Sequence, residues 1–257
     1  MAQILTGRCA LIVGAGPGLG AAIALQLGAE GAVLMLVARS DAALQDISTT
    51  LRAAKIEVKT LAADLDNPAD HQRIHDAIAT AHGKLDILVF NAARHGEQKP
   101  FAESNLADWQ QTMNTNLFAA LGLTQVLLPL LRKGAKPSIV FIGAMAMRMV
   151  SSIGRAGYAI SKAAIGQAVR SLAYELGGEG IRVNAVVPGW MDSAHVQSWR
   201  DDPKLSYHVE RALASIPLGH IPLPDEVAGS VVYLASDLSA AVTGTQIDAN
   251  GGHYMGQ

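Results

Sequence analysis

Tyr158 and Lys162 are the two side chains in this sequence whose types and spacing best suit acid–base chemistry. They stand four residues apart, so a helix would place both on one face. Lowering a tyrosine pKa from about 10 to about 7 requires about 4 kcal/mol of preference for the phenolate. A lysine ammonium about 4 to 5 Å away supplies about 3 to 4 kcal/mol at an effective dielectric constant of about 20. The spacing therefore predicts a catalytic tyrosine whose pKa is lowered by Lys162, with a chance surface pair as the alternative.

A glycine-rich stretch over residues 13–20, Val-Gly-Ala-Gly-Pro-Gly-Leu-Gly, is the second functional pattern. The apolar run before it suits a buried strand, and residues 19–30 carry apolar side chains at helical spacing. A strand-to-helix turn directs backbone N–H groups and the positive end of a helix at one point, and glycine lets a phosphate approach closely. The stretch predicts a dinucleotide-phosphate site, although a tight turn without a ligand also needs glycine.

Arg39 follows the next apolar run, residues 32–38. In dinucleotide-binding folds the end of this strand meets the adenosine ribose, where a carboxylate binds the hydroxyls of NAD and a cation suits the 2′-phosphate of NADP. Ala38 and Arg39 provide a cation and no carboxylate. We therefore predict NADP(H) in preference to NAD(H), with a solvated arginine at a strand end as the alternative.

Seven short apolar runs alternate with helical patterns along the 257 residues. Continuous apolar runs are typical of strands buried on both faces of a parallel sheet. The predicted strands cover residues 8–13, 32–38, 57–62, 85–90, 138–142, 181–187 and 246–248. The predicted helices cover residues 19–30, 41–54, 68–83, 109–131, 158–176 and 224–236. The alternation predicts one α/β domain, 1–257, with a doubly wound parallel sheet and helices on both faces.

The order of these motifs resembles the short-chain dehydrogenase/reductase family along nearly the whole chain. The resemblance rests on Gly14, Gly18 and Gly20, on Asn91-Ala92, on Tyr158 and Lys162, on Thr243-Gly244, and on Asn250-Gly251-Gly252. It implies a Rossmann-type fold and hydride transfer between a nicotinamide and a small carbonyl or alcohol substrate. Phe90 and Ala93 depart from the family pattern Asn-Asn-Ala-Gly around Asn91-Ala92.

The resemblance also implies roles for individual residues. Tyr158 would donate the proton, and Lys162 would lower its pKa and hold the nicotinamide ribose. Asn116 would hold a water in the proton relay, with a buried structural asparagine bonded to a kinked helix backbone as the alternative. Asp64 would bind the adenine amino group. The remaining implied cofactor contacts are Gly14, Gly18, Leu19, Gly20, Asn91, Ala92, Pro188, Gly189, Met191 and Ser193. Residues 190–218, polar and irregular in their later part, would form a lid over the substrate.

One family residue is missing, the serine whose hydroxyl binds the substrate carbonyl oxygen. The usual spacing back from Tyr158 reaches Ala144 or Met145, and neither side chain donates a hydrogen bond. Loss of one donor to a developing oxyanion costs about 3 kcal/mol. The replacements left open by the sequence are a backbone amide, a loop serine (Ser151 or Ser152), Arg94 and His95.

The missing serine leaves two further functions open. One is an NADP(H)-binding sensor or subunit with little catalysis of its own. The other is a reductase of activated carbon–carbon double bonds, in which the hydride goes to carbon and the serine contact matters less. NADPH consumption on enones, with the product identified, would separate double-bond reduction from carbonyl reduction. Tight cofactor binding without turnover would favour the sensor or subunit.

The bulk composition limits partners and location. A net charge of −2 without a basic run gives no footprint for nucleic acid or an anionic membrane surface. The single cysteine, Cys9, excludes an internal disulfide and fits a reducing compartment. The beginning of the chain lacks a signal-peptide pattern, and runs such as 31–38 are too short to cross a bilayer. We therefore expect a cytoplasmic protein, and the resemblance implies a homodimer or homotetramer.

His71 and His75 have the spacing of two metal ligands on one helix face. Gln72 follows where a zinc protease motif has glutamate, and no third ligand lies nearby in the sequence. We predict that both are surface histidines and that the protein has no metal site.

Overall fold

The computed structural model describes residues 3–150 and 153–255, and it contains one seven-stranded sheet of order β3-β2-β1-β4-β5-β6-β7. Each neighbouring pair of strands is parallel. The strands are β1 (Cys9–Val13), β2 (Val33–Ala38), β3 (Val58–Ala62), β4 (Ile87–Phe90), β5 (Ser138–Ile142), β6 (Arg182–Pro188) and β7 (Gln246–Ala249). The predicted fold class is confirmed, and the strand boundaries differ from the sequence prediction by at most two residues.

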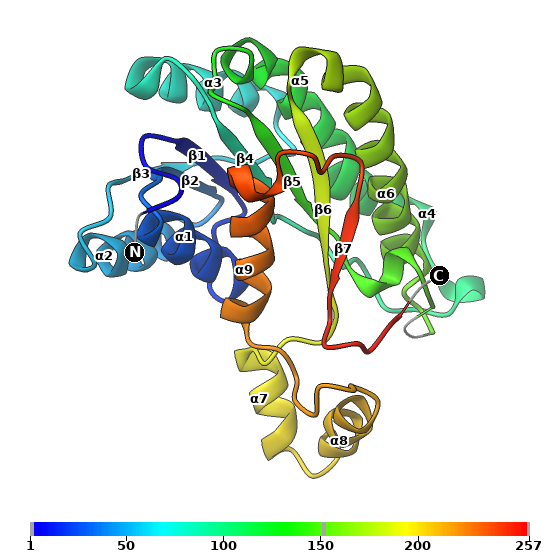
Figure 1. Ribbon diagram of the computed structural model, residues 1–257. Coiled ribbons are helices and arrows are strands. Elements are labelled where there is room, and N and C mark those ends of the chain that lie inside the picture. Colours follow the sequence, from blue (N-terminus) through cyan, green and yellow to red (C-terminus); the bar gives the residue numbers. More distant parts are fainter. Residues whose placement is uncertain (1–2, 151–152, 256–257) are drawn as a thin grey trace.

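Helices cover both faces of this sheet (Figure 1). The α-helices are α1 (Leu19–Ala29), α2 (Asp41–Ala53), α3 (Pro68–His82), α4 (Leu106–Met113), α5 (Ala119–Leu131), α6 (Ala156–Leu176), α7 (Ala194–Asp201), α8 (Ser206–Ala214) and α9 (Pro224–Ala235). Short helical turns are η1 (Phe101–Glu103), η2 (Asn114–Phe118), η3 (Met145–Met147), η4 (Gly177–Glu179) and η5 (Asp237–Ser239).

Strand β1 separates two hydrophobic cores. Ala10 and Ile12 pack with α1, α2 and α9 on one face, whereas Leu11 and Val13 pack with α3, α5 and α6 on the other. Successive side chains of a strand point to opposite faces, so a strand that is apolar throughout must be covered twice. This double burial suits an inner strand of the sheet, and the glycine turn that follows β1 lies at the carboxyl edge of the sheet.

One turn of π-helix, η2, interrupts the long helix that the sequence predicts over 109–131. The helix begins earlier than expected, at Leu106, because the Asn105 side chain accepts a hydrogen bond from the Ala107 N–H at 2.9 Å. The combined stretch Leu106–Leu131 is long and apolar enough to cross a membrane, but half of its apolar window is buried in the fold. It packs against α3 and α6, as a core helix does.

The substrate-lid segment differs from the sequence prediction. Residues 194–218 were expected to be irregular, but they contain α7 and α8, which lie together below the main body in Figure 1. Val196 and Val209 are buried between them, and Trp190 packs against Trp199 with ring centroids 5.8 Å apart. A small apolar cluster of its own therefore folds this segment, despite its polar composition.

His71 also differs from the prediction. It is buried on α3, and its Nε2 lies 2.9 Å from the Leu65 carbonyl oxygen, so it is a hydrogen-bonded interior histidine and not a surface one. His75 lies 2.9 Å from the Asp76 carboxylate. Among the residues that the structure describes, no group of three or more metal-ligating side chains is present.

Candidate active site

A cavity of about 670 Å³ lies where the carboxyl ends of strands β1 to β6 meet. Parallel α/β sheets bind ligands at this edge. The predicted site residues on its wall are Gly14, Leu19, Arg39, Asp64, Asn91, Ala92, Tyr158, Lys162, Pro188, Gly189 and Met191. Gly18, Gly20, Asn116 and Ser193 are not among the described residues that line it.

Sequence reasoning missed several wall residues. They are Val13, Gly16, Pro17, Val37, Ala38, Ser40, Ala43, Ala63, Leu65, Asp66, Ala93, Thr115, Ile142 and Gly143. Most lie within a few residues of the carboxyl end of a predicted strand, and this closeness is the sequence signal that could have identified them. Thr115 had no such signal, because the π turn of η2 places it there.

The glycine turn is fixed by close backbone packing. Gly14 has φ +84°, and a Cβ atom on it would lie 2.2 Å from the Ala92 backbone nitrogen. Asn91 Nδ2 donates a hydrogen bond to the Gly14 carbonyl at 2.7 Å. Gly18, with φ +83°, immediately precedes α1, whose first N–H groups have no intrahelical partners. The turn therefore joins β1 and β4 and leaves the positive end of α1 at the cavity.

Replacing Gly14 by alanine is expected to lower the melting temperature by about 5 to 15 °C, from about 2 to 5 kcal/mol of overlap and φ strain. Gly16→Ala is the matched control, because nothing lies within 4 Å of a Cβ there and its φ needs no glycine. Differential scanning fluorimetry of both variants measures the effect. A Gly14→Ala protein as stable as Gly16→Ala would contradict the close packing.

Arg39 is exposed on the cavity wall directly after β2, beside Ser40. The Ser40 hydroxyl caps α2 by accepting a hydrogen bond from the Ala43 N–H at 3.3 Å. Asp64 is exposed on the same wall after β3, and its Oδ1 accepts a hydrogen bond from the Asp66 N–H at 3.1 Å. These three side chains line the end of the cavity nearest β2 and β3.

Tyr158 and Lys162 both reach the cavity from the first turns of α6. Lys162 is buried, its Nζ donates a hydrogen bond to the Ile142 carbonyl at 2.8 Å, and this Nζ lies 5.8 Å from the centroid of the Tyr158 ring. Their predicted proximity on one helix face is therefore present. The lysine is anchored to the end of β5.

The pKa of Tyr158 shifts opposite to the sequence expectation. Burial raises the pKa of Tyr158 to about 12, with the Arg155 charge opposing this rise. Burial also lowers the pKa of Lys162 to about 8. Loss of hydration disfavours both charged forms, and it outweighs the attraction that the spacing alone suggested. At neutral pH Tyr158 is therefore a neutral phenol.

Ala144, one of the two positions that the resemblance offers for the missing serine, stands on the cavity wall with Tyr158. Met145 is instead buried, and its sulfur would lie 3.0 Å from a Cβ on Gly189. The methyl group of Ala144 offers no hydrogen bond to a substrate. Ser151 and Ser152, the loop serines considered as replacements, lie outside the described residues.

Asn116 lies in the π turn and its side-chain amide is fully engaged. Its Oδ1 accepts from the Arg94 N–H at 2.7 Å, and its Nδ2 donates to the Arg94 carbonyl and the Ser161 hydroxyl at 2.9 and 2.8 Å. Ser193 caps α7, its hydroxyl accepting from the Val196 N–H at 3.4 Å. Both side chains therefore hold nearby backbone in place: Asn116 holds the loop at Arg94, and Ser193 holds the first turn of α7.

Comparison with known proteins identifies the family of this chain. A family model described as enoyl-(acyl carrier protein) reductase matches residues 14–254. The chain belongs to the short-chain dehydrogenase/reductase family. As a member it is an enzyme, an oxidoreductase.

Relatives of this short-chain dehydrogenase/reductase align along their full lengths. It is 34% identical to a rhamnolipids biosynthesis 3-oxoacyl-(acyl-carrier-protein) reductase of Pseudomonas aeruginosa, covering 98% of each chain. It is 32% identical to the 3-oxoacyl-(acyl-carrier-protein) reductase FabG of Escherichia coli, covering 97% of this chain and 98% of that one.

Solved structures of the family superpose closely. A dehydrogenase/reductase from Sinorhizobium meliloti 1021 matches with a TM-score of 0.89 and 29% identity, covering 99% of this chain and 98% of that one. A structure from Beutenbergia cavernae, described as an NAD(P)-dependent gluconate 5-dehydrogenase with bound NADP at low occupancy, matches with a TM-score of 0.87 and 29% identity. It covers 98% of this chain and 99% of that one.

Proposed function

We propose that this enzyme transfers a hydride between NADP(H) and a carbonyl or alcohol substrate, with Tyr158 as the acid and base. The observation that carries the proposal is one cavity that holds Tyr158, Lys162, the glycine turn and Arg39 together. NADPH, when bound, supplies the hydride to the carbonyl carbon. Tyr158 gives its phenol proton to the carbonyl oxygen, and Lys162 lies beside it to stabilise the phenolate that remains.

The protonation state of Tyr158 supports the reductive direction. A pKa of about 12 keeps the phenol protonated at neutral pH, which is the form that a proton donor needs. The alkoxide formed from a reduced carbonyl is a much stronger base than a phenolate, so this proton transfer is favourable. Alcohol oxidation needs the phenolate first, which burial disfavours.

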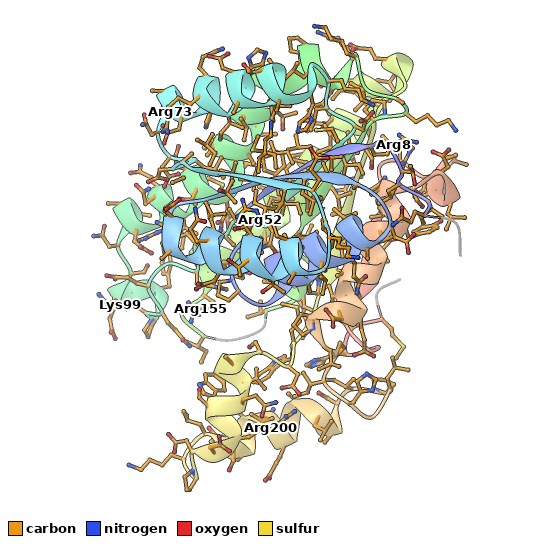
Figure 2. The ribbon with its side chains drawn as sticks, turned by 90° about the vertical axis from the view of Figure 1, so that its left-hand side faces the viewer. Arg8, Arg52, Arg73, Lys99, Arg155 and Arg200 are labelled. Atoms are coloured by element: carbon orange, nitrogen blue, oxygen red, sulfur yellow. The ribbon has the colours of Figure 1, made fainter. Side chains whose placement is uncertain are left out.

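Support for NADP(H) comes from Arg39 and from the related structure with bound NADP. A hydrogen bond to a charged group contributes about 1.5 to 3 kcal/mol. We therefore expect Arg39→Ala to raise the Kd of NADPH about 10- to 100-fold and to leave the Kd of NADH unchanged. Arg52→Ala is the control. Arg52, labelled in Figure 2, lies in the last turn of α2 and is not among the described residues that line the cavity. Equal effects of Arg39→Ala on both cofactors would reject this preference.

Turnover of a substrate panel tests the reaction. NADPH oxidation is measured with 3-oxoacyl thioesters, other ketones, aldehydes and enones, with the product identified. The thioesters come first because two relatives are named 3-oxoacyl-(acyl-carrier-protein) reductases. The family model's own description, enoyl-(acyl carrier protein) reductase, makes reduction of an activated double bond the second candidate. Tight NADPH binding without any turnover would favour a sensor or subunit.

We also propose that the protein works in the cytoplasm as a homodimer or homotetramer. Its one cysteine, Cys9, is buried and free, as suits a reducing compartment. Exposed apolar side chains gather on elements that pack together, namely Leu106 of α4, Phe118 of η2 and Ile160 and Tyr174 of α6. A second copy of the chain would cover this face, and light scattering of the purified protein tests it.

A further inference from the structure

His95 lies beside Tyr158 in the cavity. Its ring packs against the phenol ring with centroids 4.8 Å apart and an angle of 33° between the planes. Ala144 contributes only a methyl group to the same cavity. The cavity therefore has no side-chain hydrogen-bond donor at Ala144, one of the two positions that the resemblance offers for the serine, and has an imidazole packed on Tyr158.

The loop before His95 is held rigidly by its backbone. Asn116 binds both the N–H and the carbonyl of Arg94, at 2.7 and 2.9 Å. The Arg94 guanidinium is paired with Asp108, whose other carboxylate oxygen accepts from the Glu97 N–H at 2.9 Å. Arg94 therefore does not line the cavity, and its charge is committed elsewhere.

The loop after His95 is held as closely. Gly96 has φ +67°, and a Cβ on it would lie 2.7 Å from Asp108 Oδ2 and from Thr112 Oγ1. The Arg155 Nη1 atom lies 3.4 Å from both the His95 and the Gly96 carbonyl oxygens. The loop is thus anchored on both sides of His95, and His95 is the residue of 94–97 whose side chain reaches the wall. Such anchoring is what a preorganised donor requires.

We propose that His95 donates the second hydrogen bond to the substrate's carbonyl oxygen, in place of the missing serine. This inference rests on the proposed carbonyl reduction. An imidazole has two ring nitrogens, so one can be oriented by a neighbour while the other presents its N–H to the oxygen that Tyr158 protonates. The oxygen would then be bound from two sides, by the phenol and by the imidazole, while negative charge develops on it.

Two substitutions, His95→Phe and His95→Gln, test whether His95 is this donor. Each is made in the native protein and in the Ala144→Ser variant. Phenylalanine keeps a ring against Tyr158 but has no donor, whereas glutamine keeps an N–H donor without the ring. We expect His95→Phe to lower kcat for the best carbonyl substrate about 10²- to 10³-fold and His95→Gln to lower it less. Ala144→Ser should restore at least about tenfold to His95→Phe and change the native enzyme less than about threefold. The Kd of NADPH should stay within about twofold throughout, because neither change touches the phosphate end of the cavity.

The outcomes separate this inference from the proposed function. Full activity of His95→Phe would assign the donor elsewhere, to a backbone amide or a loop serine, and overturn the role of His95. Equal losses in both His95 variants without rescue by Ala144→Ser would show a merely structural role and overturn it as well. A native enzyme that binds NADPH but reduces no carbonyl would instead reject the proposed function, and the inference with it.

Discussion

Tyr158→Phe is expected to lower kcat for carbonyl reduction about 10²- to 10⁴-fold while leaving NADPH binding nearly unchanged. General acid catalysis contributes rate factors of this size, and the change removes the only proton that the tyrosine can give. The phenylalanine ring keeps the packing against His95 and the place beside Lys162, whose Nζ lies 5.8 Å from the centroid of the Tyr158 ring, so the cavity keeps its shape. The loss should therefore fall on kcat and not on KM.

Tyr174→Phe is the matched control, because Tyr174 lies on the same helix and is 91% exposed. Stopped-flow or steady-state oxidation of NADPH measures both variants, and fluorescence titration gives the Kd of NADPH. If Tyr158→Phe retains the native kcat, the proton comes from another group and the assignment of Tyr158 fails. If it also loses NADPH binding, the variant reports on structure and not on proton transfer.

The fold was accessible from sequence because strands such as β1 and β2 are apolar on both faces. Residues of β1 and β2 form continuous apolar runs, and the central position of β1 leaves no exposed face to interrupt them. Helix caps were equally local signals, such as Asn67, which accepts a hydrogen bond from the Ala69 N–H, with Pro68 following. Each of these features depends on neighbours within a few residues.

The unpredicted features depend on burial and tertiary contacts that residue type and local spacing do not reveal. The Lys162 ammonium donates to Ile142, twenty residues away, and helical spacing could not reveal that acceptor or the burial that raises the pKa of Tyr158. His71 has the polarity of a surface residue, but the Leu65 carbonyl offers it a buried partner. The segment with α7 and α8 folds on a few apolar residues, including Val196 and Val209, that are too sparse to give a clear period.

Sequence patterns predicted which residues of the site are reactive better than they predicted how the residues are arranged. Types and spacing singled out Tyr158, Lys162 and Arg39, and the structure brings all three to one cavity. The sequence could name His95 only as one of several substitutes for serine. Its position against Tyr158 follows from Gly96 in the same loop and from Asp108 and Asn116, which hold the loop from α4 and η2.

Lys162→Met is expected to make the free energy of unfolding less dependent on pH between about 8 and 10. Burial lowers the pKa of Lys162 from 10.5 to about 8 in the folded protein, so between these values the unfolded chain binds more protons. The native protein should therefore become more stable as pH rises through this interval, by up to about 3 kcal/mol from this group. Methionine, which keeps the buried length without the charge, removes that gain.

Urea unfolding at pH 7, 8, 9 and 10 measures the slope, with Lys133→Met as the control because Lys133 is exposed. Tyr158 has the opposite effect on stability, and at higher pH. Burial raises its pKa from 10.0 to about 12, so stability falls again as pH rises above 10.

Below pH 8 the methionine variant should be the more stable protein, because the native fold there buries a charged ammonium. The same variant should lose carbonyl reduction, since no cation remains beside the Tyr158 phenolate. If the variant is more stable but less active than the native protein at neutral pH, Lys162 serves the chemistry at a cost to the stability of the fold. If the unfolding free energies of the native and variant proteins change with pH at the same rate, Lys162 does not titrate in this interval.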